Sequence, residues 1–94
     1  MINTVQLGNC LDLMKNIIDK SIDAIIADLP YQQTSQNKWD KLISIEPLWK
    51  EYRRIIKEHG VVCLTGQGLF SAKMIISAQD IYRYSLIWKK NKPR

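Results

Sequence analysis

Four consecutive residues, Asp28-Leu29-Pro30-Tyr31, combine a hydrogen-bond acceptor, a stiff turn and a flat aromatic ring. Proline fixes its own φ angle and has no N–H, so it stiffens the turn that precedes the tyrosine. A carboxylate and nearby main-chain carbonyl oxygens accept hydrogen bonds from an amino group, and a phenol ring offers a flat surface for stacking. The quartet therefore has the parts needed to hold a planar base by its exocyclic amine.

The quartet directly follows an apolar run, residues 22–27, whose length and β-branched content are typical of a buried parallel strand. In open α/β folds, ligands bind outside the carboxyl ends of the strands. We therefore expect Asp28 to stand at a ligand-binding edge of a sheet. A plainer interpretation stays open, in which Asp28 only shapes the turn and Tyr31 only packs.

The elements around the quartet are expected to alternate between strands and helices. The pattern predicts strands at 4–7, 22–27, 61–65 and 82–89, and helices at 10–17, 45–59 and 69–78. Such alternation implies an α/β fold with a mostly parallel sheet and flanking helices, in one domain that spans residues 1–94. A long polar loop, residues 32–43, follows the quartet, and loops of that length are often functional.

Helix boundaries are indicated by particular residues. Asn9 is a suitable N-cap for the first helix, and Ser44 is a suitable N-cap for the second. Pro47 is tolerated in the first turn of the second helix, and Gly60 is expected to end it. The apolar stripe of this second helix, which we assign to the core, consists of Ile45, Leu48, Trp49, Tyr52 and Ile56.

The composition is that of a water-soluble globular domain. Hydrophobic residues make up 46% of the 94 residues and charged residues 24%. No apolar run approaches the roughly 20 residues that cross a bilayer, and the N-terminus lacks the pattern of a signal peptide. Cys10 and Cys63 have no C-x-x-C spacing, and His59 is the single histidine. We therefore expect a cytoplasmic protein with reduced cysteines and no metal site.

The net charge of +5 favours a polyanionic partner such as nucleic acid. The positive residues fall into two groups, and for both a solvated surface and direct phosphate contact stay open as interpretations. The first group lies on the second expected helix, and the second lies at the C-terminus. The groups are Lys50, Arg53, Arg54 and Lys57, and Lys89, Lys90, Lys92 and Arg94.

Taken together, these segments resemble the amino-terminal part of the S-adenosylmethionine-dependent DNA amino-methyltransferases, which modify adenine at N6 or cytosine at N4. The quartet is similar to the catalytic signature of this family in its Asp-Leu-Pro-Tyr variant. The resemblance runs over nearly all of the chain, and it implies a partial Rossmann-like methyltransferase fold. The segments that carry it are 8–14, 22–31, 38–40, 49–60, 65–67 and 87–90.

The resemblance implies methyl transfer from S-adenosylmethionine to the N6 amine of adenine in DNA. Asp28 and the carbonyl of Leu29 or Pro30 would accept the two amine hydrogens, and Tyr31 would stack on the extruded base. Asn9, Cys10 and Asp28 would contact the cofactor, although the family usually has an aspartate where Asn9 stands. Two alternatives stay open: a non-catalytic remnant or module that binds DNA or a partner, and a methyltransferase that acts on RNA or a protein amide.

A second signature of the family, a Phe-x-Gly-x-Gly turn that cradles the cofactor, has no match in these 94 residues. One branch of the family carries that turn late in the chain, after the catalytic quartet. We therefore expect a truncated product, an isolated domain or one part of a split enzyme. The strand at 22–27 would then lack a neighbour, and an exposed strand edge favours a homo-oligomer or strand exchange.

Overall fold

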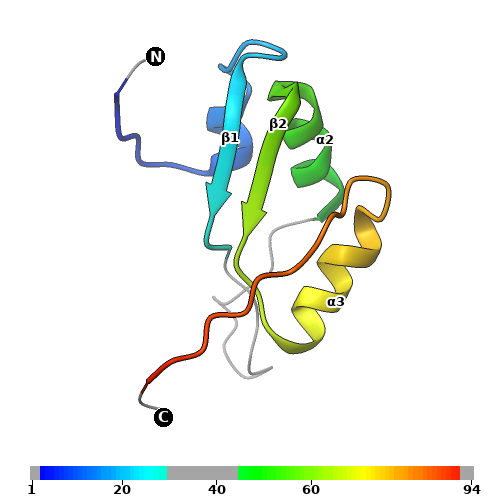
Figure 1. The fold of residues 1–94 in the computed structure, drawn as a ribbon. Coiled ribbons are helices and arrows are strands. Elements are labelled where there is room, and N and C mark those ends of the chain that lie inside the picture. The colour runs from blue at the N-terminus through cyan, green and yellow to red at the C-terminus, as the bar shows by residue number, and fades with distance from the viewer. Residues whose placement is uncertain (1–2, 30–44, 92–94) are drawn as a thin grey trace.

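The computed structural model of the chain describes residues 3–29 and 45–91. These residues form a small α/β unit, in which helices and strands follow one another along the chain (Figure 1). The described elements, in chain order, are α1 (Cys10–Met14), β1 (Ile22–Ala27), α2 (Ile45–Ile55), β2 (Ile56–Leu64) and α3 (Gly68–Ser77).

Strands β1 and β2 pair in parallel, as the alternation of elements predicts. The bounds of β1 are those expected from the apolar run. Near the carboxyl ends, Ile26 lies opposite Cys63 and Ala27 lies opposite Leu64. Four strands were expected, whereas the sheet formed by the described residues has two. The structure is therefore a small parallel α/β unit that is compatible with part of a methyltransferase fold.

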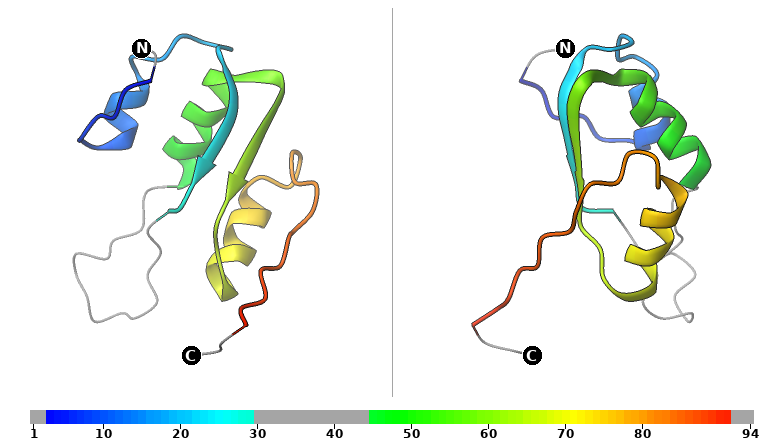
Figure 2. Two further views of the ribbon diagram at one scale, coloured as in Figure 1. Left: turned by 60° about the vertical axis from the view of Figure 1, so that its left-hand side comes forward. Right: turned by 45° about the vertical axis from the view of Figure 1, so that its right-hand side comes forward.

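The core lies between the sheet and its helices. The right-hand view of Figure 2 shows all three helices on one side of the two strands. Leu48 of α2 is the most deeply buried side chain, with 1% of its surface exposed. The inner face of the sheet packs against this core through Ile25, Ala27, Val62 and Leu64. Trp49 belongs to the core, as expected, and its ring meets that of Tyr52 edge to face.

Asn9 caps α1, as predicted. Its side-chain Oδ1 accepts a hydrogen bond from the Leu11 backbone N–H at 2.9 Å. The N–H groups of a helix's first turn have no partner within the helix, and this bond satisfies one of them. The helix ends at Met14, three residues before the expected end at residue 17. Turns follow instead, and Asn16 and Ile17 still donate to carbonyls three residues earlier.

The prediction that Gly60 ends the second helix is wrong. Helix α2 stops at Ile55, and β2 begins at Ile56, five residues before the expected strand. The register is irregular here, because Ile56 faces Ile22 whereas Val61 faces Ala24. A Cβ on Gly60 would lie 2.5 Å from Ile56 Cγ1 and 3.0 Å from the Asp23 carbonyl oxygen. Close approach within the sheet, and not a helix cap, explains the glycine.

Two further expected strands are not formed. Residues 4–7 and 82–89 are described, but neither segment is a strand. Their apolar side chains are largely exposed, as Leu7 and Trp88 show. Alternating side chains stabilise a strand only when a neighbouring strand supplies the ladder, and neither segment has one here. Helix α3, by contrast, begins and ends one residue earlier than expected.

Several predictions fall outside the described residues: the loop at 32–43, the cap Ser44, and Pro30 and Tyr31 of the quartet. Pro47 lies in the first turn of α2, as expected. Among the helices within 3–29 and 45–91, none is long and apolar enough to cross a membrane.

Candidate active site

Asp28 stands directly after β1, at the carboxyl end of the parallel pair. Its side chain is exposed to solvent. Thr65, the first residue after the neighbouring strand β2, holds this side chain by a hydrogen bond. The Thr65 hydroxyl donates to Asp28 Oδ1 at 2.5 Å. The Thr65 backbone N–H donates to the Ala27 carbonyl oxygen at 3.1 Å, which extends the ladder by one residue beyond the strands. One threonine therefore fixes both the backbone and the carboxylate at this point.

The alternation of side chains explains why Asp28 faces solvent. Ala27 packs toward the helices, so the next side chain points to the opposite face of the sheet. Leu29 then turns into the core, where 7% of its surface is exposed. In the sequence, the carboxylate is thus flanked by Ala27, which is partly buried, and Leu29, which is buried. The Asp28 carboxylate is exposed to solvent, and its hydrogen bond with Thr65 ties it to β2.

Asn9 and Cys10 mark the other expected contact region, before and at the start of α1. Asn9 is exposed, and its amide oxygen is used by the cap on Leu11. The amide NH2 is therefore the group that Asn9 can offer to a ligand, whereas an aspartate at this position would offer a second acceptor oxygen. Cys10 is half-buried and packs against the core.

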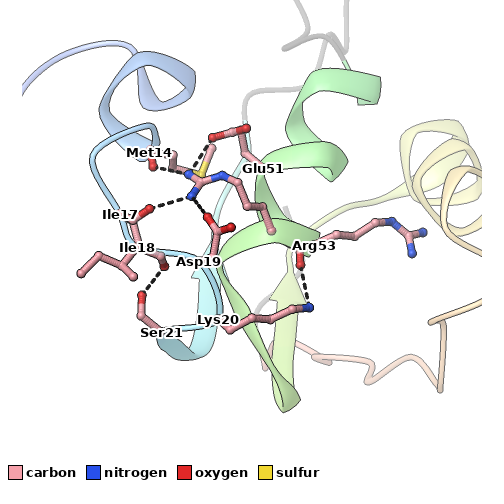
Figure 3. A network of polar contacts seen from close by, with 9 residues as sticks. Met14, Ile17, Ile18, Asp19, Lys20, Ser21, Glu51 and Arg53 are labelled. Atoms are coloured by element: carbon pink, nitrogen blue, oxygen red, sulfur yellow. Dashed lines mark hydrogen bonds and ion pairs between the residues drawn. The ribbon is translucent and has the colours of Figure 1, made fainter.

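The basic residues of α2 and β2 are mostly occupied by ion pairs within the chain. Arg53 pairs with Asp80 through two hydrogen bonds of 2.8 Å, and Lys57 pairs with Asp23 at 2.9 Å. The guanidinium of Arg54 has four partners, which are Met14, Ile17, Asp19 and Glu51. Figure 3 shows these four residues gathered in one place, between α1 and α2. Lys50 is exposed on α2. These pairs reduce the positive charge that the helix offers to a phosphate backbone.

An open hollow of about 590 Å³ lies at the other end of the sheet. Lys20, Lys57 and Glu58 line it, and all three precede or begin the strands. Asp28 and Thr65 follow the strands. The hollow is therefore separate from the site that the sequence indicates, and its wide opening to solvent gives no enclosed place for a ligand.

Thr65 is the residue of this site that sequence reasoning missed. It was assigned to the end of a strand, without a role. A signal was present, because Thr65 follows its apolar run just as Asp28 follows the preceding one. Carboxyl ends of parallel neighbours meet at one edge, so the two polar residues were placed to meet. Pro30 and Tyr31 lie outside the described residues, so the structure brings together Asp28, Leu29 and Thr65.

The comparisons with known proteins agree with a methyltransferase relationship. The chain is 30% identical over 117 residues to the type II methyltransferase M.HinfI of Haemophilus influenzae. The match covers 98% of this chain and 33% of that relative, so the chain spans about a third of the relative's length. No family model matches the chain, and no solved structure matches it. The chain is thus a distant relative of one region of a type II methyltransferase.

Proposed function

We propose that this chain carries the catalytic signature of a DNA methyltransferase that acts on the N6 amine of adenine. The observation that supports the proposal most is the placement of Asp28, which is exposed at the carboxyl end of β1 and held by Thr65 at 2.5 Å. The similarity to a type II methyltransferase over 98% of the chain supports the same class of reaction.

The proposed chemistry follows from the electronic structure of the base. The adenine amine is a weak nucleophile because its lone pair is delocalised into the ring. Asp28 would accept one N–H of the amine, and the main-chain carbonyl of Leu29 or Pro30 would accept the other. These acceptors draw the nitrogen toward a tetrahedral form, which frees the lone pair for attack. Tyr31 would stack on the base after it leaves the duplex.

S-adenosylmethionine would supply an electrophilic methyl group on a sulfonium, and the protein would position the amine in line with it. The amine would gain the methyl group and give up one proton to solvent, and the thioether of the cofactor would be the leaving group. The direct transfer needs no covalent enzyme intermediate, so neither cysteine is proposed as a nucleophile. Asn9, Cys10 and Asp28 would hold the cofactor, with Asn9 and Cys10 at its adenine ring.

We propose that DNA is the macromolecular partner. The net charge of +5 supports a polyanionic partner. Ion pairs of Arg53, Arg54 and Lys57 within the described residues leave Lys50, Lys89 and Lys90 as the members of the two basic groups described without an ion pair. Because the chain spans a third of the relative, we expect little turnover from the chain alone. A module that binds DNA without the cofactor, and a methyltransferase of RNA or of a protein amide, are the other outcomes of the test.

Calorimetry with S-adenosylmethionine tests the proposal, with Asn9→Asp and Asn9→Ser as a matched pair. All three residues can cap α1, so the helix start is preserved in each variant. We expect the wild-type chain to bind the cofactor, Asn9→Asp to bind more tightly because it offers a second acceptor, and Asn9→Ser to bind more weakly. DNA binding without any uptake of the cofactor would contradict the proposal and indicate a binding module.

Transfer of a labelled methyl group to DNA, RNA and protein then identifies the substrate. Asp28→Asn keeps the shape of the side chain but removes the charge, and we expect it to abolish any methylation of DNA. Glu58→Gln, an exposed change at the opposite end of the sheet, is the control and should leave the rate unchanged. Label in RNA or protein but not in DNA would contradict the assigned substrate.

A further inference from the structure

We infer that this chain associates with a second copy of itself, and that the C-terminal segment of each copy (residues 82–90) lies on the outer face of the other copy's sheet. The outer face is the side of the two strands that carries no helix (Figure 2). The inference concerns a surface, and it stands whether or not the chain takes part in methyl transfer.

The outer face is apolar along the two strands, and Asp28 and Thr65 follow at its carboxyl end. The register places Ala24 opposite Val61 and Ile26 opposite Cys63, and all four side chains are exposed. Ile26 has 83% of its surface exposed and Val61 has 60%. Helices cover only the other side, where Ile25 and Val62 pack into the core. A parallel sheet is normally covered on both faces, so an uncovered apolar face indicates that another polypeptide packs there.

The edges of the sheet are also open. In the part of the chain that the structure describes, the sheet contains β1 and β2 alone, so each strand has one side without a neighbouring strand. The backbone groups along such an edge are a template for a further extended segment. A segment that crosses the outer face would reach these edges.

The C-terminal segment has the composition to fill that place. It belongs to none of the described helices and strands, and it exposes Tyr84, Leu86, Ile87 and Trp88. Figure 1 shows it passing the carboxyl end of β2 and leaving the body of the molecule, and Figure 2 shows it on the side away from the helices. Exposed fractions of 85% for Leu86 and 89% for Trp88 are far above what an apolar side chain retains in a finished fold.

The exposed area is large enough to supply an interface with a second copy. The chain exposes 8368 Å², whereas a compact monomer of 11.0 kDa exposes about 5,600 Å². The excess is larger than the about 800 Å² that each partner buries in a standard interface. The radius of gyration, 14.6 Å, likewise exceeds the about 12 Å of a compact chain of this length.

One chain carries both complementary surfaces, so two copies can satisfy each other in a closed two-fold arrangement. In such an interface the segment of one copy meets the sheet of its partner, and the reverse contact is identical. Each copy carries a net charge of +5. The copies therefore repel each other at long range, and salt should strengthen their association, whereas salt weakens binding to nucleic acid.

Analytical ultracentrifugation of the full chain over a wide concentration range tests the inference. We expect a monomer–dimer equilibrium whose dissociation constant falls as salt rises. Ile26→Lys should raise that constant at least tenfold, because it places a charge on the outer face. Ile76→Lys is the matched control on α3, where the isoleucine is also exposed, and it should leave the constant unchanged. A monomer at all concentrations would overturn the inference.

Mixing two variants separates reciprocal exchange from direct stacking of two sheets. Ile26→Lys places a charge on the outer face of the sheet, and Leu86→Lys places one in the C-terminal segment. Each variant alone should therefore be monomeric. Their mixture should form a heterodimer, because the intact segment of the first variant meets the intact face of the second. Circular dichroism should show that both variants retain their helices. Dimerisation of Leu86→Lys like the wild type would mean that the sheets stack directly, and the proposed exchange would be wrong.

Discussion

Thr65 and Asp28 show how a polar pair can be set by sheet register. Each residue follows a strand, and the pairing of Ala27 with Leu64 brings the next positions side by side. The hydroxyl then orients a carboxylate that solvent alone would leave free to rotate. We infer that Thr65 is a positioning residue of the proposed active site, since it acts through Asp28.

Replacement of Thr65 by valine should release the Asp28 side chain. Valine keeps the shape and strand preference but removes the hydroxyl donor. We expect NMR couplings across the χ1 bond of Asp28 to change from those of one rotamer to an average, and Thr65→Ser to restore the wild-type values. The cost in stability should be about 1 kcal/mol or less, because both groups are exposed and can bond to water.

In an assay of methyl transfer, the same substitution should lower kcat and leave the KM for the cofactor unchanged. If Thr65 only stabilised the fold, Thr65→Val would lower the unfolding midpoint without changing the rotamer populations of Asp28. Unchanged couplings in Thr65→Val would therefore contradict the positioning role, even for a chain that shows no turnover.

At the scale of the elements, two arginines of α2 join this helix to its neighbours by hydrogen bonds and ion pairs. Arg54 donates to the Met14 and Ile17 carbonyl oxygens at 2.7 Å and pairs with Asp19 and Glu51. It thereby adds a second donor to the Met14 carbonyl at the end of α1, bonds the Ile17 carbonyl in the turn that follows, and joins this region to α2 (Figure 3). Lys20 adds a contact to the Arg53 carbonyl oxygen at 3.4 Å.

Replacement of Arg54 by methionine should loosen α1 and the turn after it. The methionine keeps much of the apolar stem but leaves the carbonyls and carboxylates without their donor. We expect faster amide hydrogen exchange in residues 10–20 and a lower urea midpoint. The exchange rate and urea midpoint of Arg54→Lys should lie between those of the wild-type chain and Arg54→Met, because an ammonium group cannot reproduce the planar fork of the guanidinium. Lys50→Met, an exposed change on the same helix, is the control.

The pair of Arg53 and Asp80 joins α2 to the turn after α3, and it makes stability depend on pH. The hydrogen bond and charge of Arg53 hold the pKa of the Asp80 carboxyl below its usual 3.8. A carboxyl whose pKa is lowered in the folded state stabilises the fold at all pH values above 3.8, and this contribution is lost as pH falls through the lowered pKa.

We therefore expect the Tm difference between the wild-type chain and Asp80→Asn to be constant from neutral pH down to about pH 5, and to vanish in stronger acid. Both side chains are largely exposed, so the difference should be small and should shrink in high salt. A difference that grows as the solution becomes more acidic would contradict the assigned pairing.

As a whole, the molecule depends on a small core that covers one face of a two-stranded sheet. Eight of the described residues are buried, and Leu48 is the most deeply buried of them. The hydrogen bond from Trp49 Nε1 to Ser77 Oγ at 2.8 Å holds α3 against α2. A core of this size supplies little reserve stability, which is consistent with the large apolar surface that remains exposed.

Leu48→Ala should therefore remove most of the stability of the chain. Truncation of a fully buried leucine costs about 2–5 kcal/mol, and small domains have about 5–15 kcal/mol in all. Urea unfolding followed by tryptophan fluorescence measures the effect. Ile76→Ala, at an exposed position of α3, should change stability by less than about 0.5 kcal/mol. Equal effects of the two substitutions would show that α2 does not form the core described above.

Local signals in the sequence were sufficient to predict β1, the cap at Asn9, most of α2, and α3. Each depends on a periodicity or a side chain that acts within a few residues. The exposure of Asp28 at the end of a parallel strand followed from the same pattern, together with the rule that ligands bind at carboxyl ends.

The tertiary contacts alone decided the remaining features. Ile56 is the start of a strand because its pairing with Ile22 extends β2 to the N-terminal side of Gly60. Residues 4–7 and 82–89 are not strands, and no strand among the described residues pairs with them. The contact of Thr65 with Asp28 needs two strands that are far apart in the chain to lie in register. Helices satisfy their own backbone and can be predicted locally, whereas strands and sheet-end sites require distant partners that local sequence does not specify.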